Sequence, residues 1–141
     1  MSTPRKATAY IIIHREEVDQ WAQEYNAMVD FDGTVRISDV FGIEGKAAHA
    51  KDFNGVSVGV AFRGCFATAY NAVHNKPTKE QWEQGLLFIR GLMWWYGLSA
   101  TQVRGHTEMG PTATRDLQKL KPEYSCPGEN FSMDAFRAAL G

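Results

Sequence analysis

The chain has 141 residues, of which 44% are hydrophobic and 22% are charged, and its formal net charge is −1. These values predict a single globular domain, residues 1–141, and give no electrostatic reason to bind nucleic acid or an anionic membrane surface. No apolar stretch is long enough to span a bilayer, so membrane insertion is not expected. The polar N-terminus lacks the apolar region of a signal peptide, which indicates a cytosolic chain in which a disulfide between Cys65 and Cys126 is disfavoured.

The chain begins with a predicted strand and a short helix. Residues 7–13 form an apolar run rich in β-branched side chains, which indicates a buried strand. Residues 15–24 predict a helix, because acidic side chains stand in its first turn and three apolar residues share one face: Val18, Trp21 and Ala22.

Three further strands are expected before the longest helix. Residues 26–31 and 34–38 predict a β-hairpin, in which Asp32-Gly33 suits a type I′ turn. Residues 56–62 are apolar enough to form a central strand.

The clearest helix signal covers residues 79–96. Thr78 can cap this helix, with Gln81 at the capping-box position, and Gly97 suits its left-handed C-terminal end. One apolar stripe follows the helix period through Trp82, Leu86, Ile89, Met93 and Tyr96.

The C-terminal part predicts one more strand and one more helix. Residues 101–104 form a short strand that leads into His106, and the last helix begins at Ser132, where Phe131 and Phe136 can form a hydrophobic staple. This order of elements predicts an α/β single domain with a central mixed β-sheet flanked by helices.

Three side chains could bind one metal ion. His14 ends the first apolar run, His106 follows the predicted strand 101–104, and Cys126 comes 20 positions later, before a Pro-Gly pair. If the two strands are neighbours, both imidazoles emerge at the same end of the sheet. Two nitrogens and one sulfur, with a fourth position open for water, are the ligands of a catalytic zinc ion. Taken singly, His14 is also explained as a hydrogen-bonded histidine at a sheet edge and Cys126 as a small buried side chain; Cys65 is interpreted as structural.

A series of short motifs runs through nearly the whole chain: Ile11-Ile-Ile-His14, Tyr25-Asn-Ala-Met-Val29, Asp32-Gly-Thr-Val35, Gly45-Lys-Ala-Ala-His49-Ala-Lys51, residues 54–60, Pro77-Thr-Lys-Glu-Gln81, Gly105-His-Thr-Glu108 and Cys126-Pro-Gly128. Through them the chain resembles the zinc-dependent N-acetylmuramoyl-L-alanine amidases, in particular the small single-domain phage lysozymes of that type, which are distantly related to the peptidoglycan recognition proteins. Each motif alone is weak, whereas their order and spacing together are specific.

The resemblance implies that His14, His106 and Cys126 bind Zn²⁺ and that Tyr25, beside the metal, helps to polarise or protonate the tetrahedral intermediate. Zinc lowers the pKa of its water and acts as a Lewis acid on the scissile carbonyl, and a phenol can donate to the oxyanion as charge develops. We also predict a catalytic role for Glu108 as an acceptor that fixes an imidazole tautomer, although a solvated loop carboxylate explains it equally well.

The resemblance also implies a groove for the peptidoglycan substrate, lined by His49. Asn26 and Lys51 belong to the same motifs and are predicted to contact the substrate. At Asn26, relatives of the phage type often have a histidine.

The chain departs from the family pattern in two segments. Segment 14–25 is much shorter than usual, so groove loops are expected to be missing. Relatives often have Lys or Thr two positions before the last ligand, where this chain has Tyr124, and residues 109–123 resemble an insertion. Lys119 or Lys121 could fold back to supply the charge, although a solvated helix face is the favoured interpretation of both.

We therefore predict hydrolysis of the amide between N-acetylmuramic acid and L-alanine. The alternatives are a zinc peptidase that cuts the stem peptide and a non-catalytic peptidoglycan-binding module. A phage endolysin, expected as a monomer in the host cytoplasm and acting on the cell wall after release, needs no signal peptide; a cytosolic wall-recycling amidase fits as well. Trp94-Trp95 could join the groove, but their helical spacing favours a place in the core.

Overall fold

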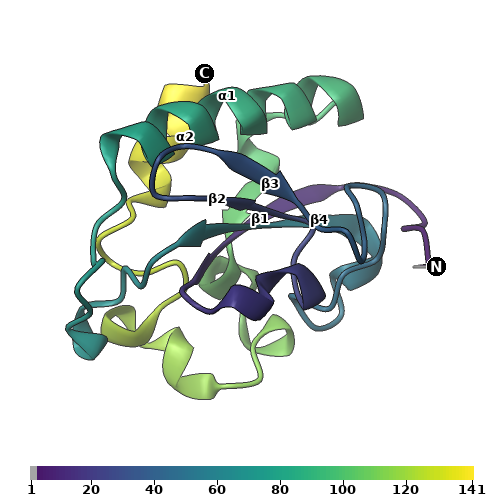
Figure 1. The fold of residues 1–141 in the computed structure, drawn as a ribbon. Coiled ribbons are helices and arrows are strands. Elements are labelled where there is room, and N and C mark those ends of the chain that lie inside the picture. Colours follow the sequence, from purple (N-terminus) through teal and green to yellow (C-terminus); the bar gives the residue numbers. More distant parts are fainter. Residues whose placement is uncertain (1–2) are drawn as a thin grey trace.

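The computed structural model describes residues 3–141 as a layered α/β structure (Figure 1). Its five-stranded sheet has the order β3-β2-β4-β1-β5, in which β3 runs antiparallel to β2 and the other neighbouring pairs are parallel. The expected α/β fold with a central mixed sheet is therefore confirmed. The strands and α-helices are β1 (Tyr10–Glu16), β2 (Ala27–Val29), β3 (Val35–Ile37), β4 (Ser57–Arg63), β5 (Val103–Gly105), α1 (Lys79–Tyr96) and α2 (Met133–Leu140).

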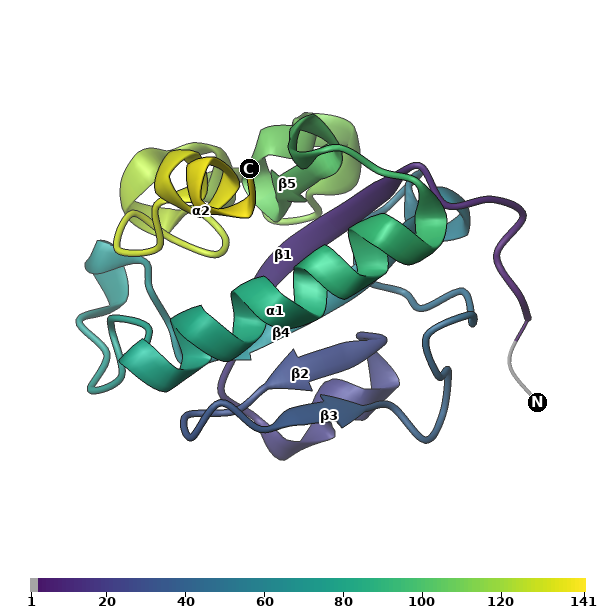
Figure 2. The same cartoon turned by 90° about the horizontal axis from the view of Figure 1, so that it is seen from above.

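The two faces of the sheet are covered differently (Figures 1 and 2). Both α-helices lie on one face, and α1 runs above β4 and alongside β1. In β1, Ile11 and Ile13 join the core beneath the helices, whereas Ile12 packs on the opposite face, together with His14 by the alternation of a strand. Short 3-10 helices fill the connections: Asp19–Gln23, Asn54–Val56, Thr68–Tyr70, Ala100–Gln102, His106–Met109, Pro111–Ala113, Leu117–Leu120 and Pro122–Tyr124.

Helix α1 has the predicted bounds and the predicted ends. The Thr78 side chain accepts from Gln81 N–H while the Gln81 side chain accepts from Thr78 N–H, which is the expected capping box. Gly97 has φ +68° at the C-terminal end, in the left-handed region. In α2, Ser132 caps the helix and the Phe131 and Phe136 rings lie 5.3 Å apart, as a hydrophobic staple requires.

The predicted helix over residues 15–24 is wrong. Strand β1 continues to Glu16, because Arg15 and Glu16 pair in register with Phe62 and Arg63 of β4. The ladder takes the first residues of the expected helix, and only the 3-10 turn Asp19–Gln23 remains.

The predicted hairpin forms, but its turn differs from the expected type I′. The Gly33 N–H donates to the Asp30 carbonyl at 2.9 Å, so Phe31 and Asp32 are the central residues of the turn. Gly33 follows with φ +85°, and the positive φ at both central residues that a type I′ turn needs is not present. The turn is one residue longer than the Asp-Gly signal suggested.

Trp94 and Trp95 do not belong to the core. Their side chains are 81% and 67% exposed on α1, the helix that covers the sheet face opposite to His14. Neither residue lines the hollows described below. Within residues 3–141 the structure has no helix that is both long and apolar enough to cross a bilayer.

Candidate metal centre

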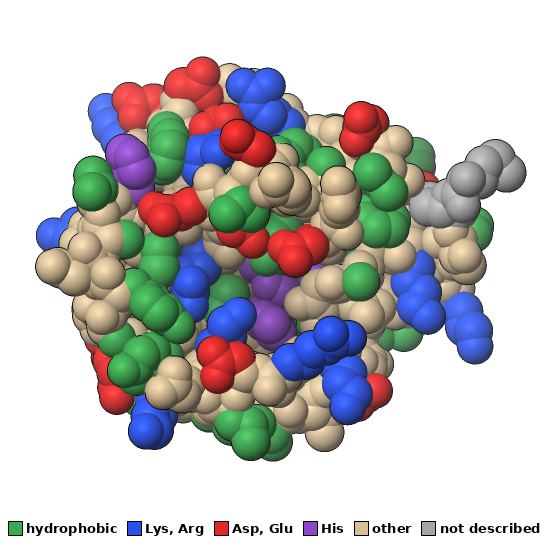
Figure 3. All heavy atoms as spheres, turned by 60° about the horizontal axis from the view of Figure 1, so that its bottom comes forward, with side chains coloured by type: hydrophobic (Ala, Val, Ile, Leu, Met, Phe, Trp, Pro, Cys, Tyr) green, Lys and Arg blue, Asp and Glu red, His purple; other side chains and the backbone are tan. Residues whose placement is uncertain are grey.

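The three predicted ligands converge on the helix-free face of the sheet. His14 lies near the end of β1, and His106 directly follows β5, whose Gly105 pairs with Ile13. Because β1 and β5 are parallel neighbours, the two imidazoles emerge at the same end of the sheet, with ring centroids 4.6 Å apart. Together with Cys126 they present ligand atoms that all lie within 4.8 Å of one another. Figure 3 shows histidine side chains in the hollow at the middle of this face, with basic and acidic side chains around them.

One hydrogen bond defines which nitrogen His106 offers. Its Nε2 lies 2.6 Å from the carbonyl oxygen of Ala113, and a carbonyl can only accept, so Nε2 carries the proton. The unprotonated Nδ1 is then free to bind a metal. The loop carbonyl thus has the role of orienting acceptor that metal-binding histidines commonly use.

Thr107 joins the two ligand segments. Its Oγ1 accepts from Cys126 N–H at 2.8 Å, and its N–H donates to the Cys126 carbonyl at 3.0 Å. The same Oγ1 donates to the carbonyl of Lys119 at 2.9 Å. One hydroxyl therefore ties the cysteine to the residue after His106 and to the segment that carries Lys119.

The donor set fits a zinc ion. Burial lowers the pKa of His14 well below 6.5, and the charges of neighbouring imidazoles and Lys119 lower it further, so the ring is neutral at pH 7, as a ligand must be. Burial also lowers the pKa of His106. Burial raises the pKa of the Cys126 thiol, while Lys119 and Arg15 oppose the rise, so a cation beside the sulfur is needed to hold a thiolate.

Tyr25 stands beside the predicted ligands. Its ring centroid lies 4.8 Å from that of His14, and its side chain is 9% exposed. Burial and the charges of Cys126 and Glu16 raise the pKa of its phenol, so the hydroxyl keeps its proton. The hydroxyl lies 3.4 Å from a carboxylate oxygen of Glu16, at the end of β1.

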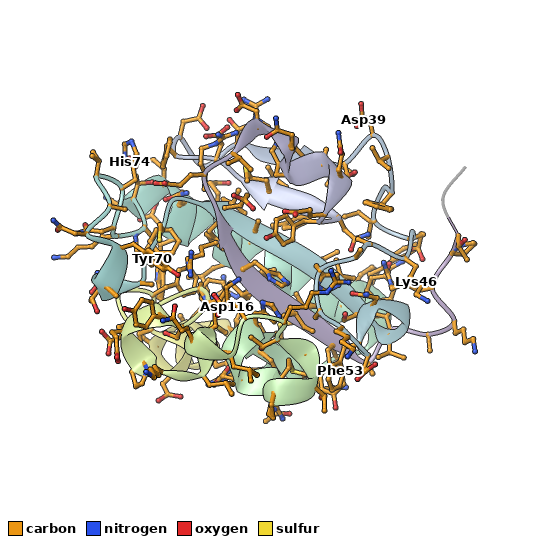
Figure 4. The ribbon with its side chains drawn as sticks, turned by 90° about the horizontal axis from the view of Figure 1, so that it is seen from below. Asp39, Lys46, Phe53, Tyr70, His74 and Asp116 are labelled. Carbon is orange, nitrogen blue, oxygen red and sulfur yellow. The ribbon has the colours of Figure 1, made fainter. Side chains whose placement is uncertain are left out.

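Two hollows meet at this centre. One is about 880 Å³ and includes Tyr70 and His74; the other is about 460 Å³ and includes Asp116. Figure 4 places Tyr70 and His74 at one end of the face and Asp116 nearer its middle. Tyr25 and Lys119 line both hollows, and His106 lines the smaller one, so the two hollows adjoin beside the predicted ligands; together they are called the groove.

The favoured interpretation of Lys119, as part of a solvated helix face, is wrong. It lies in the 3-10 turn Leu117–Leu120, is half-buried, and is close enough to lower the pKa of His14, His106 and Cys126. Lys121, in contrast, is exposed. The sequence shows a lysine at this position but contains no signal for the fold of residues 109–123.

The predicted substrate contacts divide between the groove and the interior. Lys51 is exposed and lines the smaller hollow. His49 borders the same hollow, but its ring nitrogens bond to His14 and Ser57, so neither is left for substrate; burial lowers its pKa to about 3. Asn26 is fully buried and does not form part of the groove wall. Its amide holds the backbone of three loop and strand residues: Gly42, Gly45 and Gly59.

Glu108 is not the acceptor for an imidazole. Its carboxylate accepts two hydrogen bonds from Arg137 of α2, at 2.6 and 2.8 Å, and one from Gly105 N–H at 2.7 Å. Burial alone would raise its pKa, but the Arg137 hydrogen bonds outweigh this and lower the pKa. The side chain turns toward α2 because the guanidinium forms a bidentate pair there, and the Ala113 carbonyl serves His106 instead.

Arg15 and Glu24 are groove residues that the motifs did not indicate. Arg15 lines the larger hollow, stacks over the Tyr70 ring at 5.0 Å and donates to the carbonyls of Tyr124 and Ser125. Glu24 lines the smaller hollow, and burial and the nearby Glu16 raise its pKa. Arg15 follows His14 and Glu24 precedes Tyr25 in the sequence. This proximity to predicted site residues was the signal that could have identified them.

Fold and site together define a class of small α/β proteins with a buried His-His-Cys cluster beside a groove. The family model described as N-acetylmuramoyl-L-alanine amidase matches residues 2–129, and the chain belongs to this family. The resemblance seen in the motifs is thereby confirmed, and the family supports an amidase that acts on peptidoglycan.

Solved structures share the fold at low sequence identity. The endolysin amidase LysCS from Clostridium intestinale URNW has a TM-score of 0.73 and 19% identity, over 94% of this chain and 83% of that one. AmpD has a TM-score of 0.69 and 15% identity, over 99% and 93%. Drosophila PGRP-LB has a TM-score of 0.67 and 18% identity, over 92% and 81%. No curated protein sequence matches the chain significantly.

Proposed function

We propose that the protein is a zinc-dependent amidase that hydrolyses the bond between the lactyl group of N-acetylmuramic acid and L-alanine in peptidoglycan. The observation that carries the proposal is the convergence of His14, His106 and Cys126, with ligand atoms within 4.8 Å. Nitrogen and sulfur donors of this kind suit zinc, and three protein ligands leave a fourth position open, as in catalytic sites.

The residues around the cluster match the chemistry of amide hydrolysis. When bound, zinc supplies a Lewis acid for the scissile carbonyl and a lowered pKa for the attacking water. Tyr25 keeps its proton, so its phenol can donate a hydrogen bond to the oxygen on which negative charge develops. Lys119 brings a positive charge to the same junction of the two hollows, where it favours that developing charge.

The groove suits a substrate with two unlike parts. The scissile amide joins a sugar to a peptide, and the two hollows, of about 880 and 460 Å³, share Tyr25 and Lys119 in their linings. Structures of similar fold support such a ligand: peptidoglycan recognition proteins have been solved in complex with tracheal cytotoxin, a monomeric diaminopimelic acid-type peptidoglycan.

We further propose an endolysin role, in which the enzyme stays in the host cytoplasm until another protein opens the membrane. The fold shared with an endolysin amidase supports this role. Expression in bacterial cytoplasm should leave cells intact until the inner membrane is permeabilised, after which the culture should clear. Clearing without permeabilisation would contradict the proposed role and leave the amidase chemistry standing.

The amidase proposal is tested by metal analysis combined with wall digestion. Protein purified without chelator should hold one zinc per chain, and Cys126→Ser should lose it. Mass spectrometry of digested walls should show a free lactyl carboxylate and a new L-alanine amine. A cut between amino acids would identify a peptidase instead. Wall binding without turnover, unchanged in Cys126→Ser, would identify a binding module.

A further inference from the structure

A chain of buried hydrogen bonds leads from His14 into the interior. His14 Nε2 lies 2.8 Å from His49 Nδ1, and His49 Nε2 lies 3.0 Å from Ser57 Oγ. Ser57 Oγ in turn lies 2.7 Å from the carbonyl oxygen of Phe53. The three residues that form these hydrogen bonds are buried, since His14, His49 and Ser57 are 1%, 7% and 0% exposed. Water therefore does not compete for these bonds, and the direction of each bond is determined by the groups themselves.

The Phe53 carbonyl sets the direction of every bond in the chain. A carbonyl only accepts, so the Ser57 hydroxyl donates to it and must accept from His49, whose proton then sits on Nε2. A neutral imidazole carries one proton, so His49 Nδ1 is an acceptor and receives Nε2–H of His14. His14 is left with an unprotonated Nδ1. The same nitrogen is free in His106, whose Nε2–H is bound by Ala113.

We propose that Ser57 and His49 are positioning residues that hold His14 in the one tautomer able to bind zinc through Nδ1. This inference rests on the proposed function and deepens it, because it names what prepares the first ligand for the metal. It also gives His49 a role other than the predicted contact with substrate.

The backbone around His49 keeps its ring in this place. Gly59 of β4 lies so close that a Cβ there would stand 2.5 Å from His49 Cγ, so only glycine leaves room for the ring. Asn54 Oδ1 accepts from both His49 N–H, at 2.9 Å, and Ala50 N–H, at 2.8 Å, which holds the loop that carries the ring. The imidazole is thus seated against the sheet and fixed from both sides.

Without the Ser57 hydroxyl, His49 and His14 should no longer be restricted to one tautomer each. Without an acceptor at Nε2, the His49 ring can carry its proton on Nδ1 and donate it to His14 Nε2. His14 would then keep its own proton on Nδ1 and could not bind zinc through that atom. Removing an outer partner of a metal-binding histidine typically weakens metal binding by about 10- to 100-fold.

The test compares zinc affinity and histidine tautomers in full-length Ser57→Ala and Ser38→Ala. Ser38 is a matched control, because it is also a buried hydroxyl that donates to a carbonyl, that of Ala22, but it contacts no imidazole. Competition with a chelator should show zinc binding weakened about 10- to 100-fold in Ser57→Ala and unchanged in Ser38→Ala. In zinc-loaded wild type, ¹⁵N spectra should show His14 bound through Nδ1 and protonated at Nε2.

Two variants of His49 keep the proposal testable if Ser57→Ala fails to fold. His49→Phe retains a flat ring without hydrogen bonds and should weaken zinc binding as Ser57→Ala does. His49→Gln retains one acceptor and one donor and should restore part of the affinity. Unchanged zinc affinity in His49→Phe and Ser57→Ala, or His14 bound through Nε2, would overturn the proposal. If wild type itself binds no zinc, the proposed function fails as well. If wild type binds zinc and cleaves walls but the variants keep its zinc affinity, only the proposed role of Ser57 and His49 fails.

Discussion

At the scale of single residues, the site depends on a few backbone carbonyls and on the hydroxyls of Ser57 and Thr107. The Ala113 carbonyl fixes the tautomer of His106, and Thr107 bonds to Cys126 and Lys119 at once. Neither the Ala113 carbonyl nor the Thr107 hydroxyl is itself a metal ligand or a charged group. Their importance comes from burial, because a buried donor or acceptor without a partner costs about 1–3 kcal/mol.

Replacing Thr107 should loosen two parts of the site together. Thr107→Val keeps the shape of the side chain but removes the acceptor of Cys126 N–H and the donor to the Lys119 carbonyl. We expect zinc affinity to fall about tenfold, since the outer partners of ligands typically contribute that much or more, and wall hydrolysis to fall with it. Thr107→Ser keeps the hydroxyl and should behave like wild type in chelator competition. Equal affinity in Thr107→Val and Thr107→Ser would show that the hydroxyl does not matter.

Lys119 should matter for turnover and not for the metal. Lys119→Met removes the positive charge at the junction of the two hollows, and we expect kcat for amide hydrolysis to fall about 100-fold with zinc content unchanged. Lys121→Met is the matched control, because Lys121 is exposed in the same segment. If both variants retain wild-type kcat, the charge of Lys119 plays no part in the transition state.

At the scale of elements, a complete set of local end signals determines α1, whereas pairing with a distant strand overrides the local pattern of residues 15–24. The bounds of helix α1 could be predicted to the residue, because each end carries its own signal within a few positions. These signals are the Thr78 cap with its capping box and the C-terminal Gly97. The helix expected over residues 15–24 failed because β4, far along the chain, pairs with Arg15 and Glu16 and extends β1. No pattern within the segment itself could show this competition.

The site, like the elements, could be predicted only in part from the sequence. His14 and His106 each follow a predicted strand, and all three ligand residues, Cys126 included, lie in motifs of the family, so their convergence could be foreseen once the two strands were expected as neighbours. The place of Lys119 could not, because the segment that carries it is held by a hydrogen bond to Thr107 and not by any periodic pattern. Asn26 and Glu108 were misassigned because their partners, the glycine backbone and Arg137, are distant in sequence.

Asp30 joins the hairpin to β4 and should make stability depend on pH. It pairs with Arg36 and Arg63 at 3.0 Å each. Burial alone would raise its pKa, but hydrogen bonds from Phe31 N–H and Arg36 and the charge of Arg63 lower it below the usual 3.8. The ionised form is therefore favoured in the folded state. Its contribution is present above pH 3.8 and is lost as the pH falls through the lower, folded-state pKa.

Asp30→Asn should accordingly destabilise the fold at neutral pH by about 1–2 kcal/mol, and the difference from wild type should vanish in acid. Urea unfolding of both proteins, in the presence of a chelator so that metal ligands do not contribute, measures this difference against pH. Asp39→Asn, at an exposed position, is the control and should show no such dependence. A difference that persists undiminished below pH 2 would mean that packing, and not charge, explains the loss.

At the scale of the whole molecule, the two faces of the sheet have different sources of order. The helix-covered face is held by a continuous apolar core that joins the strands to α1 and α2. On the other face, the segment from His106 to Tyr124 consists of short 3-10 turns, which bury little apolar surface and rely on hydrogen bonds. A metal ion bound by His14, His106 and Cys126 would connect β1 to His106 at the start of that segment and to Cys126 just after its end.

Zinc should therefore stabilise the molecule unevenly. At a free zinc concentration 100 times the dissociation constant, binding adds about 2.7 kcal/mol, which for a chain of this size raises Tm by roughly 5–10 °C. Hydrogen exchange should show the gain mainly in the segment from His106 to Cys126, while amides of α1, already held by the apolar core, should change little until global unfolding. Cys126→Ser should lose most of both effects. Equal protection of α1 and of the His106–Cys126 segment in zinc-free protein would show that the segment is ordered without the ion, and that the metal serves chemistry alone.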